Sequence, residues 1–151
     1  MSKQKEQKKI LVLSPEEYKN LLSKIELIEV SLTSSSTSIN LAKMVPESSS
    51  LGSPQISIND DIKRSKIKDH FQINAQWHLA AKFEKDDKNF MDITASFNVL
   101  LLCKSSMPNN FWKIYNKSTL PLIVYPYFRE FVQNMTARMN IPPLTLPILF
   151  R

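Results

Sequence analysis

The sequence predicts a mixed domain in which a long antiparallel hairpin is combined with helices. Between residues 71 and 103, apolar and polar residues alternate, which is the pattern of strands with one buried face. Beyond residue 120, apolar residues recur at three- and four-residue spacing, as they do on one face of a helix. The length of 151 residues fits one domain with a sizeable core, and 42% hydrophobic with 23% charged residues is usual for a globular chain.

The composition excludes several classes of active site. Gly52 is the one glycine, whereas a phosphate-binding loop, a dinucleotide-binding fingerprint and a nucleophile elbow each need at least two. Two histidines and the single Cys103 exclude an ordinary zinc cluster and any intramolecular disulfide. The sequence also offers no recognisable pair of nucleophile and base. We therefore expect neither an enzyme nor a bound cofactor or metal.

The sequence also bears on where the protein works. Residues 1–9 are lysine-rich, but the apolar stretch that follows, residues 10–13, is shorter than the roughly 7–15 residues of a secretory signal. Apolar runs such as Val99–Cys103 are far below the roughly 20 residues that cross a bilayer as a helix. The free thiol fits a reducing compartment. We therefore expect a cytoplasmic protein without membrane insertion.

The first expected element is a short helix that begins at Pro15. Ser14 is suited to cap this helix, Pro15 suits its first position, and Glu17 completes a capping box. The helix is predicted to extend to about Lys24.

The region between this helix and the hairpin is predicted to be mostly irregular. Residues 28–33 alternate between apolar and polar, which predicts a half-buried strand. The serine-rich stretch 34–53 reads as a long crossover, but it contains Met44 and Leu51 and is therefore more than a solvated spacer. A short strand is predicted at residues 55–59.

The hairpin is the clearest signal in the sequence. Its odd positions are apolar in both strands, as Phe71, Ile73, Ala75, Trp77, Leu79, Ala81 and Phe83, and then Met91, Ile93, Ala95, Phe97, Val99, Leu101 and Cys103. The polar stretch 84–89 is the turn between them. Near the end of the second strand, Leu100 and Leu102 make the even face apolar too, and a strand that is apolar on both faces is covered on both. We therefore predict an oligomer contact at Val99, Leu100, Leu101 and Leu102.

A helix is predicted to start at Pro121 and to stop at Pro142 and Pro143. Its apolar face is formed by Phe128, Phe131, Val132, Met135 and Met139. The tail, residues 144–150, is predicted to be apolar and extended.

The stretch from residue 120 to residue 150 resembles the SecB family of protein-export chaperones. The matching elements are Pro121, Pro126, Tyr127, Arg129, Glu130, Arg138, Pro143, Leu144 and Leu146. The order of strand, long crossover, second strand, hairpin and helix is also similar to that of the family. The resemblance therefore extends over residues 25–151, which we predict to form the chaperone domain, with residues 1–24 as a separate polar segment and short helix.

The resemblance implies an α+β fold with a four-stranded antiparallel sheet and helices packed on one side. It also implies a homotetramer that holds unfolded precursor proteins without ATP and passes them to the SecA motor. Some relatives serve instead as chaperones of an antitoxin in a toxin–antitoxin pair. In the family, clients lie in apolar grooves floored by the sheet and walled by the main helix and the crossover.

The family layout gives a set of candidate groove residues. Aromatic side chains on the helix give sequence-tolerant contacts, methionine adapts to varied clients, and Phe128 and Val132 are by default core. Trp77 is either core or groove floor. The predicted client-binding residues are Met44, Leu51, Trp77, Tyr125, Tyr127, Phe131, Leu144 and Leu146.

An alternative function is suggested by the basic residues. The net charge is +6, and lysines and arginines concentrate in residues 3–9 and 62–68. Such patches bind phosphates, but no helix-turn-helix, RRM or OB signature accompanies them. The sequence therefore favours a chaperone of unfolded proteins, with an antitoxin-directed chaperone or a nucleic-acid-associated protein as the alternatives.

Overall fold

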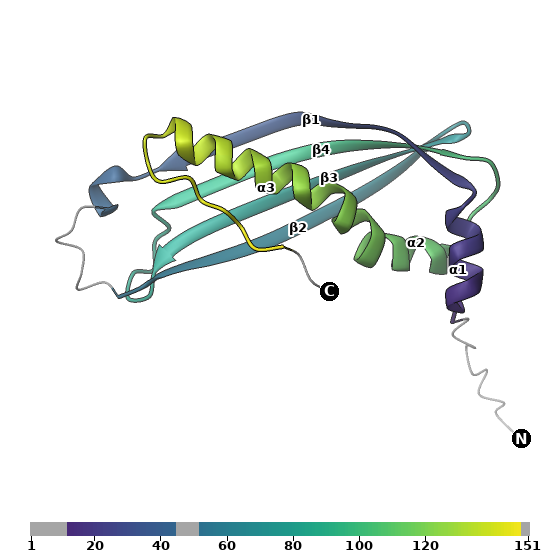
Figure 1. Ribbon diagram of the computed structural model, residues 1–151, viewed down its shortest axis with the longest axis horizontal. Coiled ribbons are helices and arrows are strands. Elements are labelled where there is room, and N and C mark those ends of the chain that lie inside the picture. Colours follow the sequence, from purple (N-terminus) through teal and green to yellow (C-terminus); the bar gives the residue numbers. More distant parts are fainter. Residues whose placement is uncertain (1–11, 45–51, 149–151) are drawn as a thin grey trace, which may run out of the picture.

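The computed structural model, which describes residues 12–44 and 52–148, has an α+β fold (Figure 1). A four-stranded antiparallel sheet in the order β1-β4-β3-β2 carries helices on one face, so the predicted fold class is confirmed. The elements are α1 (Pro15–Leu22), β1 (Ile25–Ile39), the 3-10 helix η1 (Leu41–Met44), β2 (Pro54–Ile67), β3 (His70–Phe83), β4 (Met91–Cys103), α2 (Asn109–Ile114), the π-helix η3 (Tyr115–Thr119) and α3 (Leu120–Arg138). No described helix has both the length and the apolar character needed to cross a bilayer.

The core is built on the β3–β4 hairpin. Its register places odd residues opposite odd residues, as in the pair of Ile73 and Val99, so the apolar side chains of both strands share one face. Ile73, Leu79, Ile93, Val99 and Leu101 are completely buried on this face. The opposite face carries mainly polar side chains, and the helices therefore cover only one side.

The two outer strands are longer than the sequence predicts. β1 extends over 15 residues and includes the serines that were expected to be irregular, because it pairs with β4 along its whole length. Register shifts after Leu27 and Leu32 interrupt its alternation, which hides the strand from a period-2 search. β2 pairs with β3 from Pro54 to Ile67, well beyond the expected residues 55–59.

The main helix begins earlier than predicted. The α2, η3 and α3 segments follow one another without a break from Asn109 to Arg138, and Pro121 lies inside this run instead of at its start. The wider π-helical turn joins the segments, with the Leu120 N–H donating to the carbonyl of Tyr115. Phe128 and Val132 are completely buried against the sheet, as predicted.

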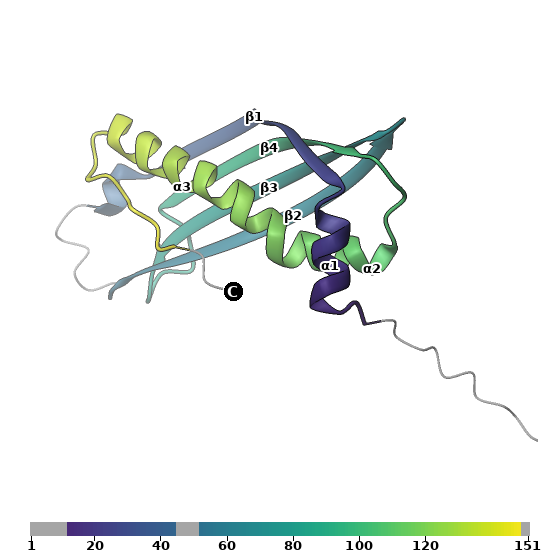
Figure 2. The same cartoon turned by 45° about the vertical axis from the view of Figure 1, so that its right-hand side comes forward.

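The N-terminal helix packs against the start of the main helix (Figures 1 and 2). The Tyr18 ring stacks on Phe111 with centroids 5.1 Å apart, and its hydroxyl forms a 2.5 Å hydrogen bond with the Thr119 hydroxyl. Ser14 and Glu17 form the predicted capping box, and hydrogen bonds from Ser14 lower the pKa of Glu17.

The chain reverses direction after α3. Asn140 has a φ of 59°, the left-handed conformation that asparagine tolerates at the end of a helix. Residues 141–148, which we call the strap, then run back along α3 in both views of the ribbon (Figures 1 and 2).

Candidate functional site

Large apolar side chains are exposed along the β1 edge of the sheet. Leu27 pairs with Leu101 and Leu32 with Phe97, and both partners are buried on the helix-covered face. Because directly opposed residues of antiparallel strands share a face, Leu27 and Leu32 also lie on the helix side. They are nevertheless 46% and 47% exposed, since β1 runs along the edge of the sheet beyond α3 (Figure 1).

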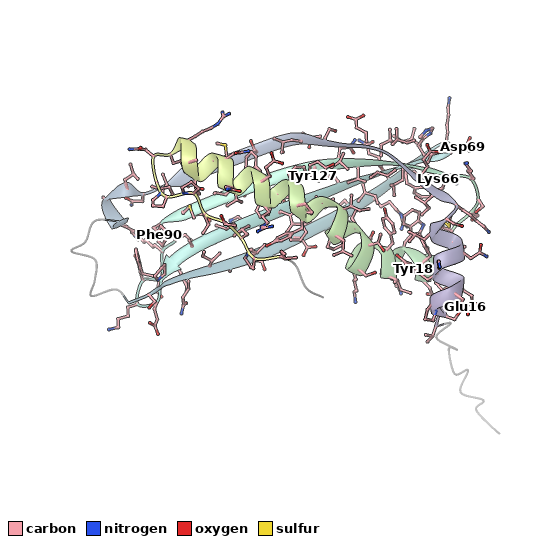
Figure 3. All side chains as sticks on the ribbon, in the orientation of Figure 1. Glu16, Tyr18, Lys66, Asp69, Phe90 and Tyr127 are labelled. Atoms are coloured by element: carbon pink, nitrogen blue, oxygen red, sulfur yellow. The ribbon has the colours of Figure 1, made fainter. Side chains whose placement is uncertain are left out.

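The main helix adds an aromatic side chain to this surface. The Tyr127 ring lies 6.3 Å from the Phe97 ring, and Figure 3 shows Tyr127 where α3 borders β4. Tyr127 is 47% exposed, while Phe131, one turn further along, is half-buried. Tyr127 and Leu32 therefore flank the same buried Phe97 from two elements. We call the surface formed by Leu27, Leu32, Tyr127 and Phe131 the β1–α3 strip.

The strip lies beside an open strand edge. β1 is the first strand of the sheet order, so among the described residues only one of its edges is paired, to β4. Its other edge presents backbone N–H and C=O groups to which an extended chain can add as a further strand. The strip can therefore bury apolar side chains of a polypeptide while the β1 edge pairs with its backbone.

The 3-10 helix η1, which follows β1, is linked to the turn between β3 and β4 by an ion pair. The Lys43 ammonium donates to the Asp86 carboxylate at 2.6 Å, and this bond, together with the Lys88 N–H, lowers the pKa of Asp86. Leu41 in η1 is 56% exposed. The ion pair therefore fixes η1, and with it an exposed leucine, to the turn between β3 and β4.

The opposite flank of α3 is covered by the strap. The Tyr125 hydroxyl donates to the Pro147 carbonyl at 2.9 Å, and the Arg129 Nε donates to the Leu146 carbonyl at 2.5 Å. The Leu144 N–H donates to the Thr136 hydroxyl at 2.9 Å. Burial raises the pKa of Tyr125. A cavity of about 180 Å³ remains between α3 and the strap, lined by Pro121, Leu122, Tyr125, Pro126, Arg129 and Ile148.

The structure brings together only part of the predicted groove. Tyr127 and Phe131 lie in the β1–α3 strip. Trp77, Tyr125 and Leu146 are buried within the chain, with the Trp77 ring 5.2 Å from Tyr125, and Leu144 is half-buried in the strap. Leu51 and the side chain of Met44 lie outside the described part of the chain. That these residues bind a client stays a prediction.

The predicted oligomer contact divides between the two faces of the sheet. Val99 and Leu101 are completely buried under the helices. Leu100 and Leu102 are half-buried on the opposite face, where they pair with Gln72 and His70. Any contact with a second copy on this face would therefore use Leu100 and Leu102, and it stays a prediction.

Sequence reasoning missed the β1 part of the strip. Leu32 lies in the predicted strand 28–33 and Leu27 just before it. The alternation shows which side chains share a face but not which strand lies at the edge. β1 is an edge strand because it pairs with β4 and with no other described strand. No local sequence signal predicts this pairing.

Comparison with known proteins supports the resemblance found in the sequence. No family model matches the chain. The SecB-like chaperone Rv1957 of Mycobacterium tuberculosis strain H37Rv is 32% identical over 101 residues, and the SecB-like chaperone MT2006 of strain CDC 1551 is 31% identical over the same length. The matched stretch covers 62% of this chain and 45% of each relative, so the chain spans about half the length of these proteins.

A solved structure shares the fold. The Mycobacterium tuberculosis Rv1957 SecB-like chaperone, in complex with a ChAD peptide from the Rv1956 HigA1 antitoxin, superposes with a TM-score of 0.68 at 18% sequence identity. The superposition covers 87% of this chain and 94% of that one. The chain is therefore similar in sequence to SecB-like chaperones over about half of their length, and it shares the fold of one of them.

Proposed function

We propose that this chain is an ATP-independent chaperone, a holdase that binds unfolded or precursor proteins on the β1–α3 strip. The observation that carries the proposal is the row of exposed apolar side chains beside an open strand edge, at Leu27, Leu32 and Tyr127. The chaperone names of the similar proteins support it.

The binding mechanism follows from the surface. An unfolded client exposes apolar side chains and unpaired backbone, and burial of apolar area contributes about 25 cal/mol per Å². The strip receives the side chains, and the β1 edge pairs with the backbone. Several weak contacts along one long client, repeated on a second copy of the chain, give avidity without sequence specificity. No step needs nucleotide or a chemical reaction, so the protein is proposed not to be an enzyme.

The proposal includes the setting in which the chaperone works. We propose a cytoplasmic homo-oligomer, a tetramer in which Leu100 and Leu102 contribute to a contact between copies, with SecA as a predicted partner. The single thiol of Cys103 supports the reducing compartment, and the half-buried leucines on a mainly polar face support the contact. Light scattering coupled to size exclusion tests the assembly, and a monomer at micromolar concentration would contradict it.

Suppression of aggregation tests the chaperone activity. A denatured model enzyme is diluted into buffer with and without a molar excess of this protein, in the absence of nucleotide, and turbidity is recorded. We expect suppression that is the same with and without ATP. A requirement for ATP, or no suppression at any excess, would contradict the proposal.

A second candidate is a chaperone dedicated to one antitoxin. It is favoured by the structural relative, whose partner is a peptide from an antitoxin. Binding of a labelled peptide from the antitoxin of this chain's own genomic neighbourhood is compared with binding of a denatured model enzyme. A peptide affinity at least a hundredfold higher would identify a dedicated chaperone, whereas similar affinities would identify a general holdase.

A further inference from the structure

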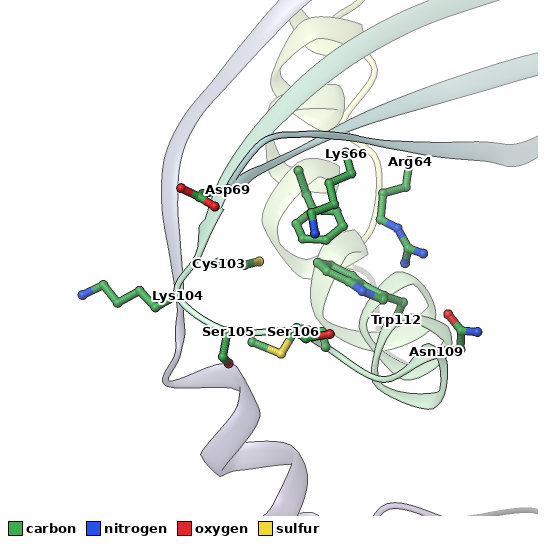
Figure 4. Close-up of a pocket in the computed structure, with 11 residues that line it drawn as sticks. Arg64, Lys66, Asp69, Cys103, Lys104, Ser105, Ser106, Asn109 and Trp112 are labelled. Carbon is green, nitrogen blue, oxygen red and sulfur yellow. The ribbon is translucent and has the colours of Figure 1, made fainter.

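A cationic pocket lies at the end of the sheet away from the crossover (Figure 4). Its volume is about 570 Å³, and it opens between the end of β2, the end of β4 and the start of α2. The lining residues are Arg64, Lys66, Asp69, Phe71, Cys103, Lys104, Ser105, Ser106, Met107, Asn109 and Trp112. Arg64 and Lys66 in this lining belong to the basic segment of residues 62–68, which forms no part of the β1–α3 strip.

Two cations of β2 converge on the aromatic floor of this pocket. The Arg64 guanidinium lies 4.4 Å from the centre of the Trp112 ring and 5.7 Å from that of Phe71, and the Lys66 ammonium lies 5.7 Å from the Phe71 ring. Figure 4 shows Arg64 and Lys66 on the same side as the Trp112 ring, whereas Lys104 and Asp69 point away from it. The two charges are therefore held together over one apolar surface.

These cations lack an anionic partner. Within the described ranges, neither Arg64 nor Lys66 forms an ion pair. The neighbouring Lys63 does, with its ammonium 3.4 Å from the Asp61 carboxylate. Arg64 is exposed at one side, but its partial burial against the rings lowers its pKa more than Cys103 raises it. A bound anion would offset this partial burial.

A second cavity adjoins the pocket. It measures about 400 Å³, shares Arg64, Asn109 and Trp112 with the first pocket, and is also lined by Lys113 and Asn116. The side-chain oxygen of Asn116 is buried and has no hydrogen-bond partner among the described residues.

We propose that this pocket binds an acidic side chain of a polypeptide, with Arg64 and Lys66 holding the carboxylate. A planar guanidinium pairs with a carboxylate through parallel hydrogen bonds, and the half-buried Phe71 ring receives the apolar part of the same segment. The inference rests on the proposed function, because it names the class of client segment that the chaperone prefers.

The same geometry disfavours other anions. A free phosphate would leave the half-buried Phe71 ring unused. A nucleic acid would stack bases on aromatic faces, but Trp112 is only 3% exposed and its ring is already covered by Arg64. An acidic residue next to an apolar residue satisfies the whole pocket.

Paired peptides test the inference. The probes are two labelled, unstructured peptides with the same apolar residues, one with glutamates and the other with glutamines at the intervening positions. In low salt, fluorescence anisotropy is expected to show about fivefold tighter binding of the glutamate peptide. The variants R64Q and K66Q are expected to abolish this preference, and R64K to retain part of it. The use of K66Q keeps the test valid if R64Q fails to fold.

A matched control separates the pocket from general basic charge. K63Q removes a cation from the same strand, but one on the opposite face, since Lys63 pairs with Asn74 there. We expect K63Q to leave the preference for glutamate unchanged. An equal loss in K63Q and K66Q would overturn the inference.

The remaining outcomes test the pocket inference separately from the holdase proposal. They also test whether the bound anion is a peptide carboxylate, a free phosphate or a nucleic acid. Equal affinity for both peptides would overturn the pocket inference while leaving the holdase proposal intact, whereas failure of both peptides to bind would count against the holdase itself.

Displacement of the glutamate peptide by inorganic phosphate more strongly than by sodium chloride of equal ionic strength would assign the pocket to a free anion. Tighter binding of a single-stranded oligonucleotide that depends on Arg64 and Lys66 would assign it to nucleic acid. Either the phosphate result or the oligonucleotide result would overturn the inference.

Discussion

The two flanks of α3 carry similar side chains but differ in what covers them. On one flank, Tyr125 is buried under the strap, and its hydroxyl donates to the Pro147 carbonyl. On the other, Tyr127 is 47% exposed beside the equally exposed Leu32 of β1. The residues are of the same type and lie two positions apart on the same helix. Their roles differ because the chain's own strap occupies one flank and leaves the other open.

This difference separates core from binding surface more clearly than residue type does. An aromatic residue on an amphipathic helix is buried by whichever segment covers it. The strap is held over this flank because Arg129 donates to the Leu146 carbonyl and the Leu144 N–H donates to the Thr136 hydroxyl. No described segment covers Tyr127 in this way. The covered flank is therefore expected to govern stability and the open flank client binding.

The largest expected effect is on the buried face of α3. Phe128 is completely buried, and its ring stacks on Trp77 with centroids 5.8 Å apart. Phe128→Ala removes this volume and leaves a cavity, which should lower the free energy of unfolding by about 3–5 kcal/mol. Urea denaturation followed by circular dichroism measures this change. A loss below about 1 kcal/mol would show that α3 does not pack on the sheet as described.

The next effect concerns the attachment of the strap. The Thr136 hydroxyl donates to the Val132 carbonyl and accepts from the Leu144 N–H. Thr136→Val keeps the shape but leaves that N–H without a partner, which should cost about 1–3 kcal/mol. Hydrogen exchange at the Leu144 amide should accelerate together with the loss of stability. The matched control is Thr145→Val at an exposed strap residue, for which a change within about 0.5 kcal/mol is expected; similar losses in both variants would contradict the assignment to Thr136.

The open flank should respond in binding instead of stability. Leu32→Ser and Tyr127→Ser each remove a half-exposed apolar side chain, so we expect the free energy of unfolding to change by less than about 1 kcal/mol. Each is expected to weaken binding of a denatured model enzyme about fivefold, as measured by the concentration that suppresses half of the aggregation. Unchanged binding in both variants would show that the client lies elsewhere, and the comparison of the two flanks would lose its functional meaning.

The hairpin and the burial of Phe128 could be predicted from the sequence because both depend on local periodicity. The pattern at residues 71–83 and 91–103 matches β3 and β4 within a residue, since each strand has one fully buried face. The outer strands could not be predicted to their full length. In β1 the bulges shift the alternation, and in β2 the segment from Asp60 to Arg64 is polar because an edge strand is only partly covered.

The candidate site was predictable only where it lies on the main helix. Tyr127 and Phe131 follow from the helical spacing, but Leu27 and Leu32 join them through the pairing of β1 with β4, residues more than sixty positions apart. The pocket at Arg64 likewise depends on long-range packing, because Trp112 comes from α2 and Arg64 from β2. Contacts between residues far apart in the chain form only in the folded structure. The sequence therefore identifies these residues without showing that they contact one another.

The smallest expected effect is the pH dependence of the Lys43–Asp86 ion pair, which ties η1 to the hairpin turn. Hydrogen bonds from Lys43 and from the Lys88 N–H lower the pKa of Asp86, so the charged carboxylate is favoured in the folded state. The stability it contributes is therefore present above the ordinary aspartate pKa of about 4 and is lost as the pH falls through the lower folded value. The difference in unfolding free energy between the wild type and Asp86→Asn should be constant near neutral pH and should shrink toward zero in acid. Lys43→Met should reproduce only part of this difference, because the hydrogen bond from Lys88 remains. A difference that stays the same from neutral pH to pH values well below the ordinary aspartate range would contradict the ion pair.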